Sequence, residues 1–243
     1  MRIAARARWV RIATSRPLAE LAKNVMTLLS NILQVVRSVP QVIKYLPPEY
    51  KTYEYFLARV EGLVRGVYGG YIGGDFVDIL ANLIRGQIDD AYSQAWADEG
   101  YDPPIPDYLN ASMEAFITAQ TNFDWIYQYY RDVVDARVDG TPIDPLLSRA
   151  SMWANQWNAA YSQAMLDIRK EEGGNLVWQL GEAEHCSTCL ALDGIVASAK
   201  EWDASGWKPQ SRDLECSGYN CACSLQPTDK RRSRGAADRL AAV

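Results

Sequence analysis

Histidine is the scarcest reactive side chain in this sequence, because His185 is the only one among 243 residues. Catalytic triads and two-histidine metal centres therefore lack either the histidines or the spacing that they need. A zinc deaminase places its histidine ligand in a His-x-Glu motif well upstream of Cys-x-x-Cys. Here Glu184 precedes His185 and Cys186 follows it at once. We therefore expect no enzyme, and a position beside a metal site is a more natural role for His185 than that of a ligand.

Cysteine is absent from residues 1–185, and all five cysteines lie between Cys186 and Cys223. A secreted disulfide scaffold distributes its pairs through the fold, and an odd number of cysteines leaves one thiol unpaired. One or two disulfides remain an alternative, but clustered thiols fit a metal site in a protein made in the cytoplasm better.

Long hydrophobic runs are also missing. The most apolar window, 25–36, is bounded by Lys23 and Arg37 and is too short to cross a bilayer. The N-terminus begins with basic residues, but no signal-peptide cleavage site closes a compact apolar run. We expect a soluble protein without a membrane span that is made in the cytoplasm.

Charge is distributed unevenly along the chain. Residues 1–23 carry six basic side chains and one acid, and residues 230–243 carry five basic side chains and one acid. The stretch between them, 24–229, has a formal charge of −14. A body this acidic does not favour broad nucleic-acid binding, although the basic ends could contact phosphates or acidic protein surfaces. The alternative is that both ends are simply solvated.

The first 172 residues show the apolar spacing of helices, punctuated by proline, glycine and aspartate. The fourth helix would be about 45–50 Å long at ~1.5 Å per residue, and it should pack with the fifth as a long antiparallel hairpin. The glycine-rich stretch 66–74 lacks the Gly-Lys-Ser/Thr ending of a phosphate-binding loop, so a flexible joint between helices is expected. The predicted helices are 15–40, 49–68, 75–99, 107–138 and 144–172.

Helical periodicity ends at Gly174, and residues 175–180 have the composition of a strand. The predicted fold is mainly α: a helical body with the long hairpin, followed by a small zinc-stapled α+β C-terminal module. The predicted parts are a basic N-terminal arm (1–23), a helical domain (24–174), a cysteine-rich zinc module (175–228) and a basic C-terminal tail (229–243).

The cysteine spacing is the most specific motif. Cys186 and Cys189 form a Cys-x-x-Cys knuckle, and Cys216, Cys221 and Cys223 follow after a loop. Four thiolates at ~2.3 Å complete a tetrahedral zinc site, and a closed shell has no open position for catalysis. A module of roughly 50 residues with few large apolar side chains needs a bound metal ion to fold. From spacing alone, Cys223 either replaces Cys221 as a ligand or packs as a small hydrophobe.

The C-terminal third resembles the Mu-type minor head proteins of tailed bacteriophages, also called phage head morphogenesis proteins. In that family a helical region precedes a Cys-x-x-Cys, a Leu-x-Gly step and a closing His-Pro-Asn-Cys-Arg-Cys. The matching residues here are Trp178, Cys186, Cys189, Leu192-Asp193-Gly194, Asn220-Cys221-Ala222-Cys223, Leu225 and Pro227.

This sequence departs from the family at three closing positions. The family's histidine position is Gly218, and its proline and arginine positions are Tyr219 and Ala222. Cys216 lies two residues before Gly218 and is a chemically sensible substitute for the missing ligand. The resemblance then makes the first-choice ligand set Cys186, Cys189, Cys216 and Cys221, with Cys223 as the alternate.

The resemblance implies a structural virion component, present in few but multiple copies near the portal vertex. Its partners would be the portal protein, the major capsid protein or both, with packaged DNA contacted through the basic termini. It would aid head assembly, DNA packaging or ejection, without catalysis. We expect residues 1–23 to contact another virion component, although folding against the acidic body is an alternative. Two other functions remain open: a cytosolic zinc-ribbon protein that binds nucleic acid, and an enzyme that uses a labile thiol.

Overall fold

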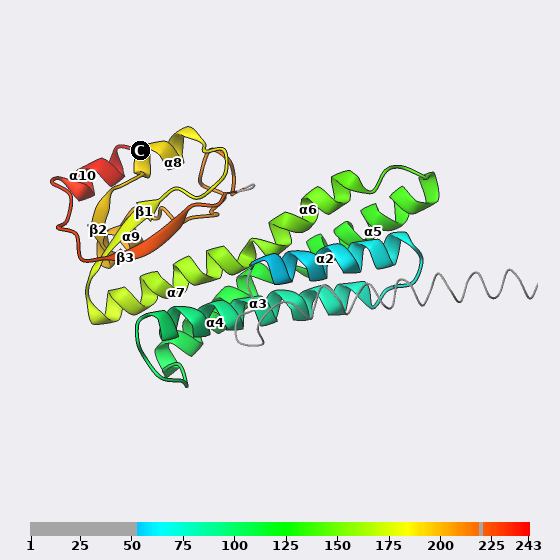
Figure 1. Ribbon diagram of the computed structural model, residues 1–243, viewed down its shortest axis with the longest axis horizontal. Helices are drawn as coiled ribbons and strands as arrows, with labels where there is room; N and C mark the ends of the chain where they lie inside the picture. Colours follow the sequence, from blue (N-terminus) through cyan, green and yellow to red (C-terminus); the bar gives the residue numbers. More distant parts are fainter. Residues whose placement is uncertain (1–52, 219–220) are drawn as a thin grey trace, which may run out of the picture. The chain divides into compact units, whose positions relative to one another are not determined.

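The computed structural model describes residues 53–218 and 221–243 (Figure 1). Residues 46–243 form one compact unit. The predicted arm 1–23 and the predicted helix 15–40 lie outside the described residues. Within the described part of the chain, no helix is long and apolar enough to cross a membrane.

Helices make up the described chain from Tyr53 to Glu172, as the sequence predicts. The described parts of the predicted helices 49–68 and 75–99 agree with the first two helices to within two residues, and the glycine-rich stretch forms the turn between them. The helices are α2 (Tyr53–Tyr68), α3 (Phe76–Asp98), α4 (Asp107–Gln120), α5 (Phe123–Asp139), α6 (Asp144–Ala154) and α7 (Gln156–Glu172).

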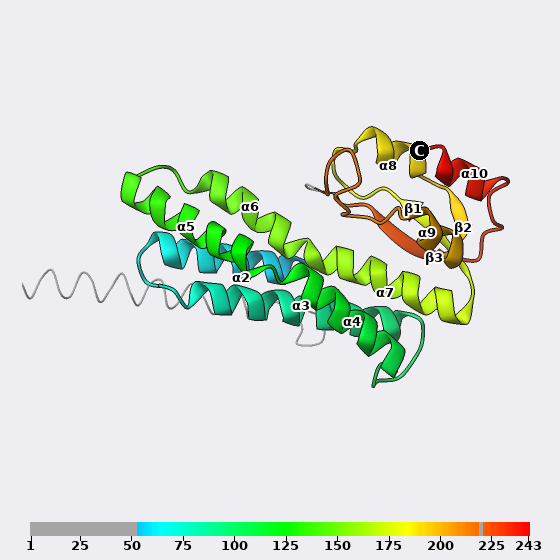
Figure 2. The ribbon, with the colours of Figure 1, turned by 180° about the vertical axis from the view of Figure 1, so that it is seen from behind.

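Helix α3 is the centre of this bundle, because it packs along α7 and also contacts α2, α4 and α5 (Figures 1 and 2). Its buried face includes Phe76, Ile84 and Tyr92, which lie at helical spacing and are fully buried. One buried polar residue, Gln87, lies on the same helix and donates through Nε2 to the carbonyl of Trp153 at 2.7 Å. Apolar burial therefore holds the bundle together, and this hydrogen bond fixes α6 against α3.

The prediction of one unbroken helix over 107–138 is wrong, because the chain leaves helical geometry at Thr121 and Asn122. Asn122 is extended (φ −89°, ψ 103°), and its side chain accepts a hydrogen bond from the backbone N–H of Trp125 at 3.2 Å. This is an N-cap, which starts a new helix by satisfying one of its free donors. The break lets α4 pack on α3 and α7 while α5 packs on α2 and α3.

The predicted helix 144–172 is also divided, with Asn155 between α6 and α7. Gly140 (φ 66°) ends α5, and the following turn brings α6 back so that the Tyr129 hydroxyl donates to the Leu146 carbonyl at 2.6 Å. However, α6 packs mainly on α2, and α7 packs mainly on α3. The predicted long antiparallel hairpin of two unbroken helices is therefore not confirmed.

The C-terminal part contains a three-stranded antiparallel sheet in the order β2-β1-β3. Trp178 on the central strand pairs with Leu225 and is fully buried against Trp202, with ring centroids 5.8 Å apart. Trp202 Nε1 donates to the carbonyl of Leu176 at 3.1 Å. The elements are β1 (Asn175–Gln179), α8 (Ser187–Leu192), β2 (Val196–Ser198), α9 (Ala199–Ser205), β3 (Ser224–Thr228) and α10 (Ala236–Ala241).

The segment predicted as a basic tail, 229–243, contributes to the hydrophobic core of the C-terminal part. Ala236 and Leu240 of α10 are buried in the same hydrophobic cluster as the two tryptophans. Trp207 Nε1 donates to the carbonyl of Leu240 at 2.9 Å, and Arg232 forms an ion pair with Glu201. Residues 232–240 are therefore folded onto the module.

We expect Asn122→Ala to lower the free energy of unfolding by about 1 kcal/mol, because the first turn of α5 loses its cap. Urea denaturation followed by circular dichroism measures this change. Asn122→Ser is the matched control, since serine also caps and should retain most of the stability. A more stable Asn122→Ala variant with higher helicity would show that one continuous helix is preferred.

Candidate metal centre

The five cysteine thiols meet in two overlapping groups. The sulfur atoms of Cys186, Cys189 and Cys216 lie within 4.8 Å of one another, and so do those of Cys189, Cys221 and Cys223. All five are free thiols. Sulfur atoms at ~2.3 Å from one tetrahedral ion are about 3.8 Å apart, so small side-chain shifts suffice. The cluster could hold a metal ion, with Cys189 common to both groups.

The start of α8 places the first two thiols. Cys186 is the N-cap residue, with an extended backbone (φ −74°, ψ 165°), and Cys189 lies three residues later on the same side of the helix. Ser187 donates to the Glu215 carboxylate through its backbone N–H at 2.8 Å and through its hydroxyl at 2.5 Å. These bonds hold the turn that carries Cys216 against α8.

The closing pair is held through backbone carbonyls. Gln210 Nε2 donates to the carbonyls of Cys221 at 3.0 Å and Cys223 at 2.5 Å. Asn155, between α6 and α7, donates through Nδ2 to the carbonyl of Cys221 at 2.9 Å. The helical body therefore helps to position the thiols that precede β3.

Two glycines allow the backbone to close around the cluster. A Cβ atom at Gly181 would lie 2.2 Å from the carbonyl oxygen of Ala222. Gly218 has a left-handed backbone (φ 76°), and a Cβ atom there would lie 2.3 Å from the carbonyl oxygen of Gln210. Gly218 is the position at which the resembled family carries histidine, so that side chain does not fit here. Cys216 instead reaches Cys186 and Cys189, as its predicted role as a substitute requires.

Cys223 is part of the thiol cluster and is not an isolated core residue. It is 1% exposed, and Cys221 is 5% exposed, and both lie within reach of Cys189. The geometry therefore supports either as the fourth ligand. His185 lies beside the cluster with its Nδ1 atom 3.7 Å from Cys223 Sγ. That is the neighbouring position predicted for this histidine.

The protons on the thiols must leave before a metal can bind. Burial raises the pKa of Cys216 to about 11 and raises that of Cys189 further. A hydrogen bond with Cys223, followed by burial, raises the pKa of Cys221. Burial also acts to raise the pKa of Cys186, but hydrogen bonds from Cys189 and Cys216 outweigh it and lower this pKa to about 7. Metal binding therefore releases protons, and acidification should weaken it.

Three other residues of the resemblance are buried with the thiol cluster. Trp178, Leu192 and Leu225 are buried together with Cys189 in the second hydrophobic cluster. Gly194 ends the segment Leu192-Asp193-Gly194 after α8 and has a left-handed backbone (φ 68°). Its N–H donates to the Trp178 carbonyl at 3.0 Å. Residues spread over 48 positions of the sequence thus form one structural unit.

The residues whose hydrogen bonds hold the cysteine-bearing segments in place were not predicted from the sequence. Asn155, Gln210 and Glu215 belong to no recognisable motif, and their partners are backbone groups or a hydroxyl remote in sequence. The polar composition of the loop before Cys216 gives no indication of which side chain turns inward.

Comparison of the chain with protein-family models, curated proteins and solved structures gave no match. The likeness to phage minor head proteins therefore depends on the sequence motif, which lies in the C-terminal part of the chain.

Because Cys189 belongs to both thiol groups, Cys189→Ser should abolish metal binding and make residues 175–243 sensitive to limited proteolysis, with cleavage near Gly173. The helical body should remain folded, since its hydrophobic cluster is separate. Leu190→Ser is the matched control, because Leu190 is 58% exposed on the same helix. A Cys189→Ser protein that keeps its metal would contradict this site.

Proposed function

We propose that this protein is a structural, non-catalytic protein whose C-terminal module is held by one zinc ion. The observation that carries the proposal is that two groups of three thiols, each within 4.8 Å of one another, share Cys189. Zinc is the metal best suited to four cysteine thiolates in a tetrahedral shell. Cys186, Cys189 and Cys216 would bind it together with Cys221 or Cys223, and the ion would supply charge neutralisation and cross-linking.

Burial of three of the five thiols supports a structural role. Cys189, Cys221 and Cys223 are all at most 5% exposed, whereas Cys186 and Cys216 are half-buried. A closed shell of four protein ligands also leaves no position for a bound water or substrate. These features speak against an enzyme with a catalytic thiol or a catalytic zinc.

We further propose that the protein is a minor head protein of a tailed bacteriophage that acts in head morphogenesis. The support is the resemblance itself, because the residues that carry it pack around the thiol cluster. The helical body would dock on portal or capsid subunits, in multiple copies near the portal vertex of the head. The basic termini could contact packaged DNA.

The nucleic-acid zinc ribbon is the second candidate function. In the described part of the chain, Arg232 pairs with Glu201 and α10 is packed onto the module, so part of the basic C-terminus already has partners in its own chain. This packing favours a structural role for the C-terminus over a phosphate-binding one.

Purified protein should carry about one zinc ion per chain. Native mass spectrometry before and after chelation measures the stoichiometry, and thermal melting measures the consequence. Chelation should lower the melting temperature, since a structural zinc ion contributes folding free energy. A metal-free protein whose melting profile is unchanged by added zinc would contradict the metal proposal.

The virion proposal requires a separate test in a phage that encodes this chain. Mass spectrometry of purified heads should detect the protein, and deletion of its gene should reduce the yield of infectious, DNA-filled particles. The virion proposal would be contradicted if wild-type heads do not contain the protein. It would also be contradicted if heads assemble normally after deletion of the gene. Such a result would leave the zinc result unaffected.

A further inference from the structure

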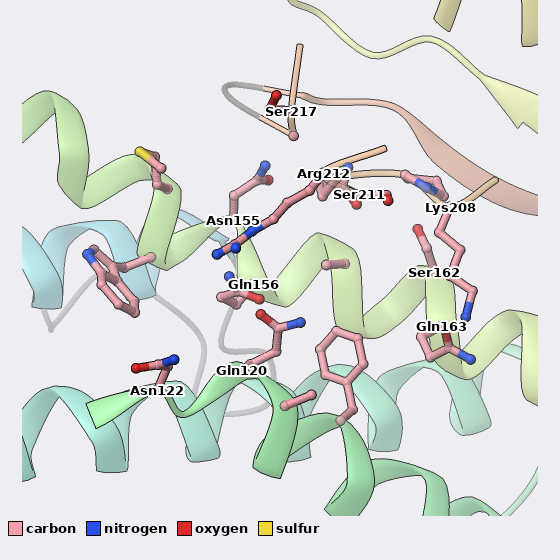
Figure 3. A pocket seen from close by; sticks show the side chains of 18 of the residues that line it. Gln120, Asn122, Asn155, Gln156, Ser162, Gln163, Lys208, Ser211, Arg212 and Ser217 are labelled. Carbon is pink, nitrogen blue, oxygen red and sulfur yellow. The ribbon is translucent and has the colours of Figure 1, made fainter. Parts of the chain in front are cut away.

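A cavity of about 520 Å³ lies between the helical body and loop 208–218 (Figure 3). Its helical wall comes from the α4–α5 junction and from the α6–α7 region, and the loop forms the facing wall. We call it the amide-lined cavity, because five side-chain amides lie along its helical wall. These amides belong to Gln120, Asn122, Asn155, Gln156 and Gln163.

The charged groups of the amide-lined cavity are both positive. Lys208 and Arg212 line it, and none of its described lining residues is acidic. The Arg212 guanidinium lies 3.8 Å from the ring centroid of Trp125, a contact that fixes its position. Asp167 is close enough to Lys208 for attraction, but it lies outside the lining and already accepts hydrogen bonds from Ser112 and Gln163. The cavity therefore favours an anionic ligand.

Two polar atoms of its lining residues have no hydrogen-bond partner in the described structure. The Ser162 side chain is 2% exposed, and its hydroxyl is unpaired. The Gln210 amide donates to two carbonyls, but its Oε1 atom accepts no hydrogen bond. A buried acceptor without a donor is costly, so a ligand that brings an N–H group would relieve it. The ligand should therefore offer both donors and an anion.

A peptide meets both conditions, because its backbone supplies N–H groups and an acidic side chain supplies the carboxylate. The phosphodiester backbone of a nucleic acid offers no donor, and the charge of −14 on residues 24–229 repels a polyanion. Residues 1–23 of this chain are not the ligand either, because their six basic side chains would be repelled by Lys208 and Arg212. The rim also exposes apolar surface at Trp125 (48%) and Met152 (45%), which suits an apolar side chain next to the acid.

We propose that the amide-lined cavity binds an extended acidic peptide segment of another protein. A glutamate or aspartate carboxylate would pair with Arg212 and Lys208, and peptide N–H groups would donate to Gln210 and Ser162. An adjacent apolar side chain would rest on Trp125 and Met152. This site is separate from the thiol cluster, and the proposal holds whether or not the protein is part of a virion.

Selection of random decapeptides by mRNA display against the full-length, metal-loaded protein identifies the ligand chemistry. We expect enrichment of sequences that place Asp or Glu beside an apolar residue. Fluorescence anisotropy of the best labelled peptide then gives its affinity for each variant. Lys208→Gln/Arg212→Gln should weaken binding at least about tenfold, because two charge-assisted hydrogen bonds are lost.

The matched control is Lys200→Gln/Arg234→Gln, which removes the same charge from exposed residues outside the cavity. It should bind within about twofold of the unmodified protein, and thermal melting should confirm that both double variants are folded. Ser162→Ala should weaken binding without lowering the melting temperature, since its hydroxyl has no partner to lose. The proposal is overturned if selection returns no acidic bias or if both double variants bind equally. It is also overturned if labelled oligothymidylate binds more tightly than the peptide with the same dependence on Lys208 and Arg212.

Discussion

The requirement to bring five thiols together at one point shapes the whole C-terminal part of this protein. Cys189 is in contact range of the other four thiols, which come from the start of α8, a loop and the approach to β3. Burial raises the pKa of Cys189, and a hydrogen bond with Cys223 raises that of Cys221, so these thiols keep their protons without a cation. A divalent ion would replace the protons and cross-link segments that are remote in sequence.

Helix α7 connects this module to the helical body. Met165 and Ile168 on α7 are buried in the first hydrophobic cluster, and Leu166 is buried in the second. Lys170 extends the contact by pairing with Asp203 of α9 at 2.5 Å. The predicted domain boundary at Gly174 coincides with the change from helix to strand, yet residues 46–243 form one compact unit. The module with the thiol cluster therefore shares packing with the helical body.

Regular periodicity made the helices and the first strand predictable from sequence, and clustered cysteines made the thiol cluster predictable. The helix breaks at Asn122 and Asn155 were missed, because each apolar pattern continues on both sides. The Asn122 side chain caps α5, whereas that of Asn155 makes no cap bond and donates to the Cys221 carbonyl. The supporting bonds of Gln210 and Asn155 could not be found either, since they reach backbone carbonyls across the fold. The cavity depends on the packing of loop 208–218 against helices, which no local pattern encodes.

The central claim is that cysteine thiolates alone surround one zinc ion in this protein. Zinc K-edge X-ray absorption of the purified protein measures the type, number and distance of the ligands directly. Our account predicts four sulfur ligands at ~2.3 Å and no nitrogen or oxygen ligand. A shell that includes nitrogen or oxygen at ~2.0–2.1 Å would place His185, a carboxylate or water on the metal and contradict a closed thiolate site.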